Sequence, residues 1–292
     1  MEAQIRTRPD NDEATEAWNG PLFDRWLAFR EILVVGVTAH GEAAMRANPP
    51  SVGDRVIDIG CGLGDTTGRL SELVGPEGST HGIDVAERMI ETARSEQTGA
   101  NVSFEVGDVQ YDPINQRYDY AFSRLGTMFF ANPVAALRNV RSALEPGASL
   151  NMVVWRQKPD NEWLYRAELV AKEYLDEPEP EETDEPTCGP GPFAMAGADV
   201  TSGILVSSGF EEITLRRSDL PITIGRDMHQ AIDVSLAIGP AGEVLRLWGE
   251  RAEEVRPEIE GKLREAFADF VRDDGSLVSP SSTWLVSAVN PG

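Results

Sequence analysis

The stretch V-I-D-I-G-C-G-L-G-D-T-T, residues Val56–Thr67, places three glycines within five positions directly after a short apolar run. The apolar run predicts a buried strand, and the residues after the glycines begin a helical pattern. Glycine is favoured where a chain turns tightly or where the backbone approaches a ligand closely. In an open α/β sheet, such a turn lies at the carboxyl end of a strand, where ligands bind. The stretch therefore predicts a ligand-binding loop between a strand and a helix.

The same strand-then-helix pattern continues from residue 52 to residue 155. Short apolar strands that alternate with helices are typical of an α/β fold, a parallel sheet with helices on both faces. The predicted strands are Arg55–Ile59, Thr80–Asp84, Val102–Val106, Tyr118–Phe122 and Ser149–Trp155, and the predicted helices span 66–74, 86–98 and 133–144.

The flanking regions are mostly helical. Aromatic and aliphatic residues recur at three- and four-residue steps over 15–47, which predicts amphipathic helices. The acidic, proline-rich stretch 176–186 predicts a flexible segment rather than a fold element. Further predicted helices span 161–175, 199–208 and parts of 228–271, and further predicted strands are Glu211–Leu215, Ile222–Ile224 and Thr283–Val289.

Composition narrows the function classes. The chain has 292 residues, of which 41% are hydrophobic, and its formal net charge is -23. This charge disfavours nucleic acid and anionic membrane partners, because both need patches of Lys and Arg. No apolar run approaches the ~20 residues of a membrane span, and the start has no apolar stretch of the signal-peptide type. We therefore expect a cytoplasmic protein. The sparse cysteines and histidines predict no metal site.

The spacing of the glycines and the neighbouring acids indicate which ligand the loop takes. A dinucleotide loop runs G-x-G-x-x-G, whereas this loop has Gly60, Gly62 and Gly64, followed by Asp65. A carboxylate near a pyrophosphate would be repulsive, so Asp65 and the preceding Asp58 favour a ligand with positive charge. S-adenosylmethionine carries an ammonium and a sulfonium and no phosphate.

Two further acids follow the next predicted strands. Asp84 ends the second strand, 20 residues after Gly64, where a carboxylate can accept both hydroxyls of a ribose. This feature does not separate NAD from S-adenosylmethionine, since both carry the ribose. Asp108 follows the third strand, where it can accept the amino group of adenine. A single Asp is often a turn former, but three carboxylates at successive strand ends favour a binding site.

With these residues in place, the chain resembles the class I S-adenosylmethionine-dependent methyltransferases over residues 52–155. The matching motifs, in order, are V-I-D-I-G-C-G-L-G, G-I-D-V-A-E-R-M-I, V-G-D-V, Y-D-Y-A-F-S-R and L-E-P-G-A-S-L. Residues 123–133 resemble the branch related to ubiquinone and menaquinone biosynthesis methyltransferases. The resemblance implies a Rossmann-like seven-stranded sheet, mostly parallel with its last strand antiparallel, with helices on both faces and a helical cap.

The resemblance also implies a role for individual residues. The three loop glycines would bring backbone to the methionine part of S-adenosylmethionine, and Asp58 would orient its amino group. Asp84 would hold the ribose, and Asp108 and Val109 would meet the adenine edge. The remaining expected cofactor-binding residues are Cys61, with no role for its thiol, Val85 and Met89 beside adenine, and Ser123 near the methionine moiety.

The resemblance further divides the chain into a core and a cap. The expected division is 1–50 N-terminal cap helices, 51–157 cofactor-binding core, 158–198 acidic lid insertion, 199–225 core continuation, 226–278 helical cap insertion and 279–292 final core strand. The last two strands would be Glu211–Leu215 and Thr283–Val289. A homodimer is compatible with the sequence but is not indicated by any motif.

The acceptor is expected to be a small, apolar or aromatic molecule, because aromatic residues gather around the predicted cap and strand ends. The candidate pocket residues are Trp18, Arg124, Met128, Phe129 and Trp163. Trp18 is the first choice for closing over the cofactor. No catalytic base stands out, and His229 is a weak candidate because it falls in the predicted cap. The sequence shows no basic cluster there, which argues against a polyanionic acceptor.

Two alternatives share the predicted fold. An NAD-dependent oxidoreductase would also use Asp84, but the glycine spacing and the acidic strand ends disfavour it. A non-catalytic S-adenosylmethionine-binding protein would keep the same pocket, because methyl transfer needs few dedicated residues. Turnover of S-adenosylmethionine to S-adenosylhomocysteine separates this alternative from an enzyme.

Overall fold

The computed structural model of the chain describes residues 11–175 and 190–292, so the predicted acidic segment 176–186 lies outside the described residues. Seven strands form one sheet with the order β3-β2-β1-β4-β5-β7-β6. Strands β1 to β5 pair in parallel, and β7 runs antiparallel to both β5 and β6. The predicted mostly parallel sheet with an antiparallel last strand is confirmed.

The strands are β1 (Arg55–Ile59), β2 (Ser79–Asp84), β3 (Val102–Val106), β4 (Tyr118–Arg124), β5 (Leu144–Trp155), β6 (Glu211–Gly225) and β7 (Leu277–Val289). The α-helices are α1 (Asp12–Asn19), α2 (Pro21–Ala28), α3 (Arg30–Ala47), α4 (Asp65–Val74), α5 (Glu87–Glu96), α6 (Pro133–Ala143), α7 (Glu162–Tyr174), α8 (Ala198–Ser207), α9 (Met228–Ala237), α10 (Pro240–Trp248) and α11 (Glu250–Ala266). Short 3₁₀ helices cover η1 (Thr127–Phe129), η2 (Lys158–Asp160) and η3 (Ala268–Phe270).

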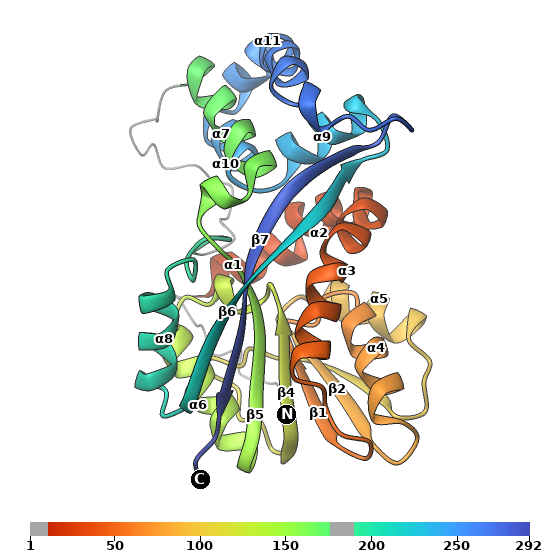
Figure 1. Ribbon diagram of the computed structural model, residues 1–292, viewed down its shortest axis with the longest axis vertical. Helices are drawn as coiled ribbons and strands as arrows, with labels where there is room; N and C mark the ends of the chain where they lie inside the picture. Colours follow the sequence, from red (N-terminus) through yellow and green to blue (C-terminus); the bar gives the residue numbers. More distant parts are fainter. Residues whose placement is uncertain (1–10, 176–189) are drawn as a thin grey trace, which may run out of the picture.

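Helices cover both faces of the sheet. In Figure 1, α3, α4 and α5 lie on one side of the strands and α6 and α8 on the other. The sheet centre is largely apolar, and Val56, Ile57, Ala121 and Phe122 are all 0% exposed. This buried sheet fixes the carboxyl ends of β1, β2 and β4 as one rigid edge, on which a site can be built.

Helix α3, part of the expected N-terminal cap, packs on β5, β6 and β7. Gly36 shows how closely, since a Cβ at this position would lie 2.9 Å from Cγ1 of Ile222. His40 joins the same helix to β7, with its ring nitrogens 2.8 Å and 3.0 Å from the hydroxyls of Ser281 and Thr283. The amphipathic period predicted the helix, but it carries no information about the element that its apolar face contacts.

Strands β6 and β7 are longer than the sequence predicted and form a two-stranded ribbon. Residues 211–215 and 222–224, expected as separate strands, belong to one strand of 15 residues, and β7 begins at Leu277 rather than Thr283. The parts that were not predicted, 216–221 and 277–282, hold two paired prolines, Pro221 opposite Pro280, and four serines. Proline and serine are poor strand formers, so these residues were not predicted to belong to the strands.

The ribbon leads from the sheet to a second group of helices, α7, α9, α10 and α11, which we call the helical layer (Figure 1). These four helices pack on one another, and α9 also packs on β6. Because α9 to α11 lie between β6 and β7 in the chain, the ribbon anchors the helical layer at both ends. The layer therefore stands in a defined position next to the strand ends.

Candidate active site

A cavity of about 1010 Å³ is enclosed between the strand ends, the N-terminal helices and the helical layer. Ligand pockets for drug-sized molecules measure roughly 300–1,000 Å³. The cavity is therefore large enough for two small molecules side by side. Residues of the glycine loop line one part of it, and residues of α2, α7 and α10 line another.

The three loop glycines have different surroundings. Gly60 and Gly62 line the cavity, whereas Gly64 does not. Gly62 has a φ of 54°, and a Cβ built on it would meet nothing within 4 Å, so its backbone faces open space. Gly64 has a φ of 80°, and its Cβ would lie 2.7 Å from the ring of Phe104. Gly64 thus lets the loop pack on β3, while the other two present backbone to a ligand.

Asp84 lies at the end of β2 and lines the cavity. Its two carboxylate oxygens each accept one hydrogen bond, at 2.8 Å from the backbone N–H of Gly62 and at 2.9 Å from that of Ala86. Burial raises the pKa of Asp84 above its usual range, while these two N–H groups oppose the rise. Each carboxylate oxygen has a second lone pair, so Asp84 can still accept two hydroxyl groups from a ligand.

Asp108 lines the cavity beyond β3, together with Val109, and has partners of its own. It accepts a hydrogen bond of 2.6 Å from the side chain of Asn11 and one of 2.9 Å from the backbone N–H of Gln110. Asn11 directly precedes α1, is 5% exposed and also lines the cavity. The N-terminal helices are therefore attached to the strand-end carboxylates, a contact that sequence analysis missed because 97 residues separate the two partners.

Asp58 and Ser123 are buried behind the loop and do not line the cavity. Asp58 accepts a hydrogen bond of 2.7 Å from the hydroxyl of Thr67, and burial raises the pKa of this carboxyl to about 7. Ser123 donates to the carbonyl of Ile59 at 2.7 Å. Both residues thus hold the loop in shape. Cys61 lines the cavity, but burial raises the pKa of its thiol, which keeps it protonated and unreactive.

Asp65 and Arg124 form an ion pair on the cavity wall, with a guanidinium nitrogen 2.7 Å from the carboxylate. The side chain of Arg124 is 12% exposed, so the pair is largely removed from solvent. Arg124 was expected in the acceptor pocket, and the structure places it at the loop, next to the first residue of α4. Its charge neutralises Asp65, whose carboxylate therefore contributes less to the choice of ligand than the sequence suggested.

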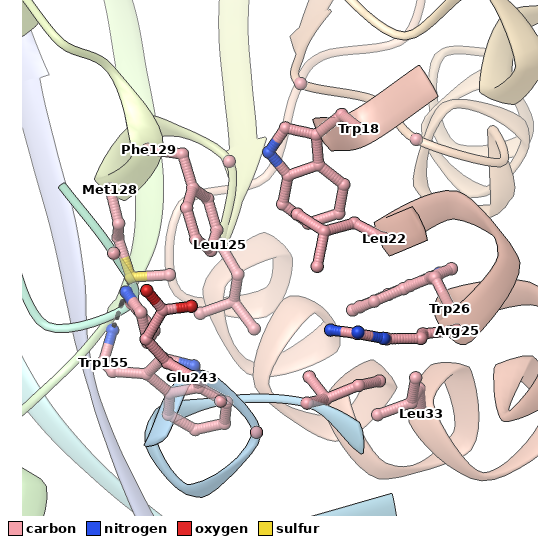
Figure 2. Close-up of a pocket in the computed structure, with 18 of the residues that line it drawn as sticks. Trp18, Leu22, Arg25, Trp26, Leu33, Leu125, Met128, Phe129, Trp155 and Glu243 are labelled. Atoms are coloured by element: carbon pink, nitrogen blue, oxygen red, sulfur yellow. Dashed lines mark hydrogen bonds between the residues drawn. The ribbon is translucent and has the colours of Figure 1, made fainter. Parts of the chain in front are cut away.

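An aromatic and aliphatic wall continues from the loop (Figure 2). The ring of Trp18 meets that of Phe129 edge to face with 5.2 Å between centroids. Met128 is held by the backbone N–H of Trp155, which lies 3.3 Å from its sulfur. Leu125 belongs to this wall and has a φ of 61°, a conformation that is uncommon outside glycine. The predicted residues Val85, Met89 and Trp163 line the cavity as well.

Several charged residues line the same cavity, and sequence analysis missed them. Lys158 donates to both oxygens of Glu168 at 2.8 Å and 2.7 Å. Arg246 donates to both oxygens of Glu243 at 2.8 Å and 2.7 Å. Arg25 extends from α2 toward the interior of the pocket (Figure 2). A signal for Arg25 was present, because it lies on the helix face that also carries Leu22, Trp26 and Phe29.

His229 is placed away from this cavity, which it does not line. Its side chain is 74% exposed on α9, and its Nε2 lies 3.5 Å from the carboxylate of Asp233 one turn further along. An exposed side chain outside the pocket cannot reach a reacting atom within it, so the structure gives His229 no catalytic position. The sequence predicted its element correctly but not the direction in which that helix face points.

Residues 11–175 and 190–292 hold no group of three or more His, Cys, Asp or Glu side chains arranged to bind a metal ion. Within the same ranges, every helix is too short or too polar to cross a bilayer.

Residues 50–175 match a family described as methyltransferase domain. Aklanonic acid methyltransferase DauC from Streptomyces sp. (strain C5) is 34% identical over 117 residues, which cover 39% of this chain and 53% of that protein. Demethylmenaquinone methyltransferase from Staphylococcus aureus is 33% identical over 97 residues, or 32% of this chain and 40% of that protein. The match thus spans about half or less of each of these two relatives.

A solved N-methyltransferase from Haemonchus contortus, in complex with phosphomonomethylethanolamine and S-adenosylhomocysteine, has the same fold. It superposes with a TM-score of 0.51 at 15% identity and covers 97% of this chain and 58% of that one.

Proposed function

Because residues 50–175 belong to the methyltransferase domain family and carry the motifs of its S-adenosylmethionine-dependent members, we propose that the protein transfers a methyl group from S-adenosylmethionine to a small apolar or aromatic acceptor. The observation that carries this proposal is the single cavity of about 1010 Å³, which connects the glycine loop and Asp84 with the aromatic wall around Phe129. The two reactants would lie within one enclosed space, as direct transfer requires.

The residues of the loop side fit S-adenosylmethionine chemically. The backbone at Gly62 is open toward the cavity and suits a close approach of the methionine part, and Gly60 lines the cavity where its backbone packs against Gly126. Asp84 has free acceptor capacity for both ribose hydroxyls. We propose Asp108 and Val109, which line the cavity beyond β3, for the adenine edge. The glycine spacing, which departs from the G-x-G-x-x-G of dinucleotide loops, favours S-adenosylmethionine over NAD.

The acceptor side fits an apolar reactant. Trp18, Met128, Phe129 and Trp163 line this part of the cavity. S-adenosylmethionine bound on the loop side would supply an electrophilic methyl group. In an SN2 step, an acceptor atom in line with the methyl–sulfur bond would form a bond to the methyl carbon while the carbon–sulfur bond breaks and S-adenosylhomocysteine leaves. An apolar wall excludes water and favours a step in which positive charge on sulfur is lost. Orientation of the acceptor by the wall provides the main acceleration.

The helical layer supplies the far wall of the cavity, through residues of α7, α9 and α10. We therefore propose the segments 158–198 and 226–278 as the parts of the chain that select the acceptor, with 51–157, 199–225 and 279–292 as the core. The core would be shared with relatives that act on other acceptors, which agrees with the methyltransferase domain match over residues 50–175.

The proposal is tested by following S-adenosylhomocysteine formation by mass spectrometry. The protein is incubated with S-adenosylmethionine and a panel of one- to four-ring aromatic acids, phenols and amines. We expect acceptor-dependent S-adenosylhomocysteine and a product 14 Da heavier than one class of acceptor. Binding of S-adenosylmethionine without transfer to any acceptor would favour the non-catalytic alternative, and binding of NAD instead would favour the oxidoreductase.

A further inference from the structure

The charged residues on the cavity wall are almost all paired. The structure gives ion pairs between Arg124 and Asp65, between Lys158 and Glu168, and between Arg246 and Glu243. Lys172 lies 3.3 Å from Glu168 as well. Of the remaining carboxylates, Asp84 and Asp108 are bonded to neighbouring N–H groups. These side chains are therefore committed to one another or to the fold.

Among the charged cavity-lining residues that the structure describes, Arg25 is the exception, because its side chain has no partner. Within residues 11–175 and 190–292, its guanidinium has neither an ion pair nor a hydrogen bond, although neighbouring Asp24 is paired with Arg88. Arg25 lies half-buried on α2, between Leu22 and Trp26, and its guanidinium points into the pocket (Figure 2). A guanidinium carries five N–H donors in a planar fork. Leaving them without partners next to apolar side chains is unfavourable.

The net charge of the residues on the acceptor side also favours an anionic ligand. Apart from the loop-side residues Asp65, Asp84, Asp108 and Arg124, the cavity wall carries four cations and two carboxylates. The four cations are Arg25, Lys158, Lys172 and Arg246, and the two carboxylates are Glu168 and Glu243. A local excess of two positive charges is unexpected in a chain whose net charge is -23. A field of this sign attracts and retains an anionic molecule.

We infer that Arg25 is a specificity-determining residue and that the acceptor is an apolar or aromatic acid whose carboxylate pairs with it. The carboxylate accepts two parallel N–H bonds from the guanidinium, the geometry that Arg favours. The rings or alkyl groups of the acid lie against the aromatic wall. This inference rests on the proposed function. It agrees with the expected lack of a basic cluster for a polyanionic acceptor, because one carboxylate needs only one guanidinium.

The test compares acids with their neutral amides in the presence of saturating S-adenosylhomocysteine. The probes are benzoate, 2-naphthoate and 2-anthracenecarboxylate and the three corresponding amides, which have nearly the same shape. Binding is measured by calorimetry for the unchanged protein, for Arg25→Gln and for Arg25→Lys. Arg46→Gln on α3 is the control, since Arg46 is exposed and lies outside the cavity.

We expect at least one acid to bind more tightly than its amide. Hydrogen bonds to charged groups imply a loss of roughly 10- to 100-fold for that acid in Arg25→Gln. Arg25→Lys is expected to recover part of the loss, because it restores the charge without the fork, and Arg46→Gln to change nothing. Affinity for the amides and for S-adenosylhomocysteine should stay the same in all variants.

The inference fails if no acid is preferred over its amide, including the case in which none of the probes binds, or if Arg25→Gln leaves the preference intact. The proposed function fails separately, if the unchanged protein does not bind S-adenosylhomocysteine. Equal weakening of an acid and its amide in Arg25→Gln would show a general packing defect and would also overturn the inference.

Discussion

Replacing Asp84 by asparagine removes the negative charge of the carboxylate that we propose to bind the ribose, and it keeps the size of the side chain. Asparagine has one acceptor oxygen where aspartate has two, so one ribose hydroxyl loses its acceptor. A hydrogen bond to a charged group is worth about 1.5–3 kcal/mol, which corresponds to a roughly 10- to 150-fold weaker Kd for S-adenosylhomocysteine. The new amide also turns an N–H group toward the backbone N–H of Gly62 or Ala86, which now donate to the two carboxylate oxygens.

The assay is calorimetric titration with S-adenosylhomocysteine, which binds without turning over. Asp119→Asn is the matched control, because Asp119 also accepts a backbone N–H bond but belongs to the start of β4, at the opposite end of the strands. Thermal unfolding of both variants checks that they are folded. A folded Asp84→Asn with unchanged affinity would refute the assignment of this carboxylate to the ribose, and equal weakening in Asp119→Asn would indicate a general effect on the fold.

Three further predictions follow from the same geometry. Gly62→Ala is expected to weaken S-adenosylhomocysteine binding by at least tenfold, because the added methyl group projects into the ligand space. Gly53→Ala is the control, since Gly53 also has a positive φ, of 90°, and open space around it but lies outside the cavity. The same titration should show unchanged binding for Gly53→Ala. Trp18→Ala removes the edge-to-face partner of Phe129 and should raise KM for the acceptor more than Kd for the cofactor, as steady-state kinetics would show; equal effects would contradict it. Burial lowers the pKa of His40 to about 4, so the folded state resists protonation, and the free energy of unfolding should fall as the pH drops from about 6.5 to 4. At pH 5 this loss is about 2 kcal/mol, and urea titrations at pH 7.5 and 5 should show a smaller loss for His40→Gln than for the unchanged protein.

The core of the site could be predicted because its residues are close in sequence and constrained by backbone geometry. Asp84 is the last residue of β2 and Gly62 lies in the loop that follows β1, and parallel strands end at the same edge of a sheet. Their mutual hydrogen bond of 2.8 Å is a consequence of that register. Local patterns of this kind can be recognised in the sequence without knowledge of the tertiary structure.

The rest could not be predicted, because it depends on which surfaces meet. The apolar face of α3 gave no indication that it would pack on β6 and β7 as well as line the cavity through Ile32, Leu33 and Val37. Arg25 and Glu243 come from helices that are far apart in the sequence, and only the folded chain brings both to one cavity. His229 shows the reverse case, since its segment was predicted to be helical, but its side chain faces solvent.

The central claim is that the loop side of the cavity, between Gly62 and Asp84, is a site for S-adenosylmethionine. Parallel calorimetric titrations of the unchanged protein with S-adenosylhomocysteine and with NAD test it most directly. The account predicts micromolar binding of S-adenosylhomocysteine and no measurable binding of NAD. Binding of NAD alone, or of neither nucleotide, would contradict it.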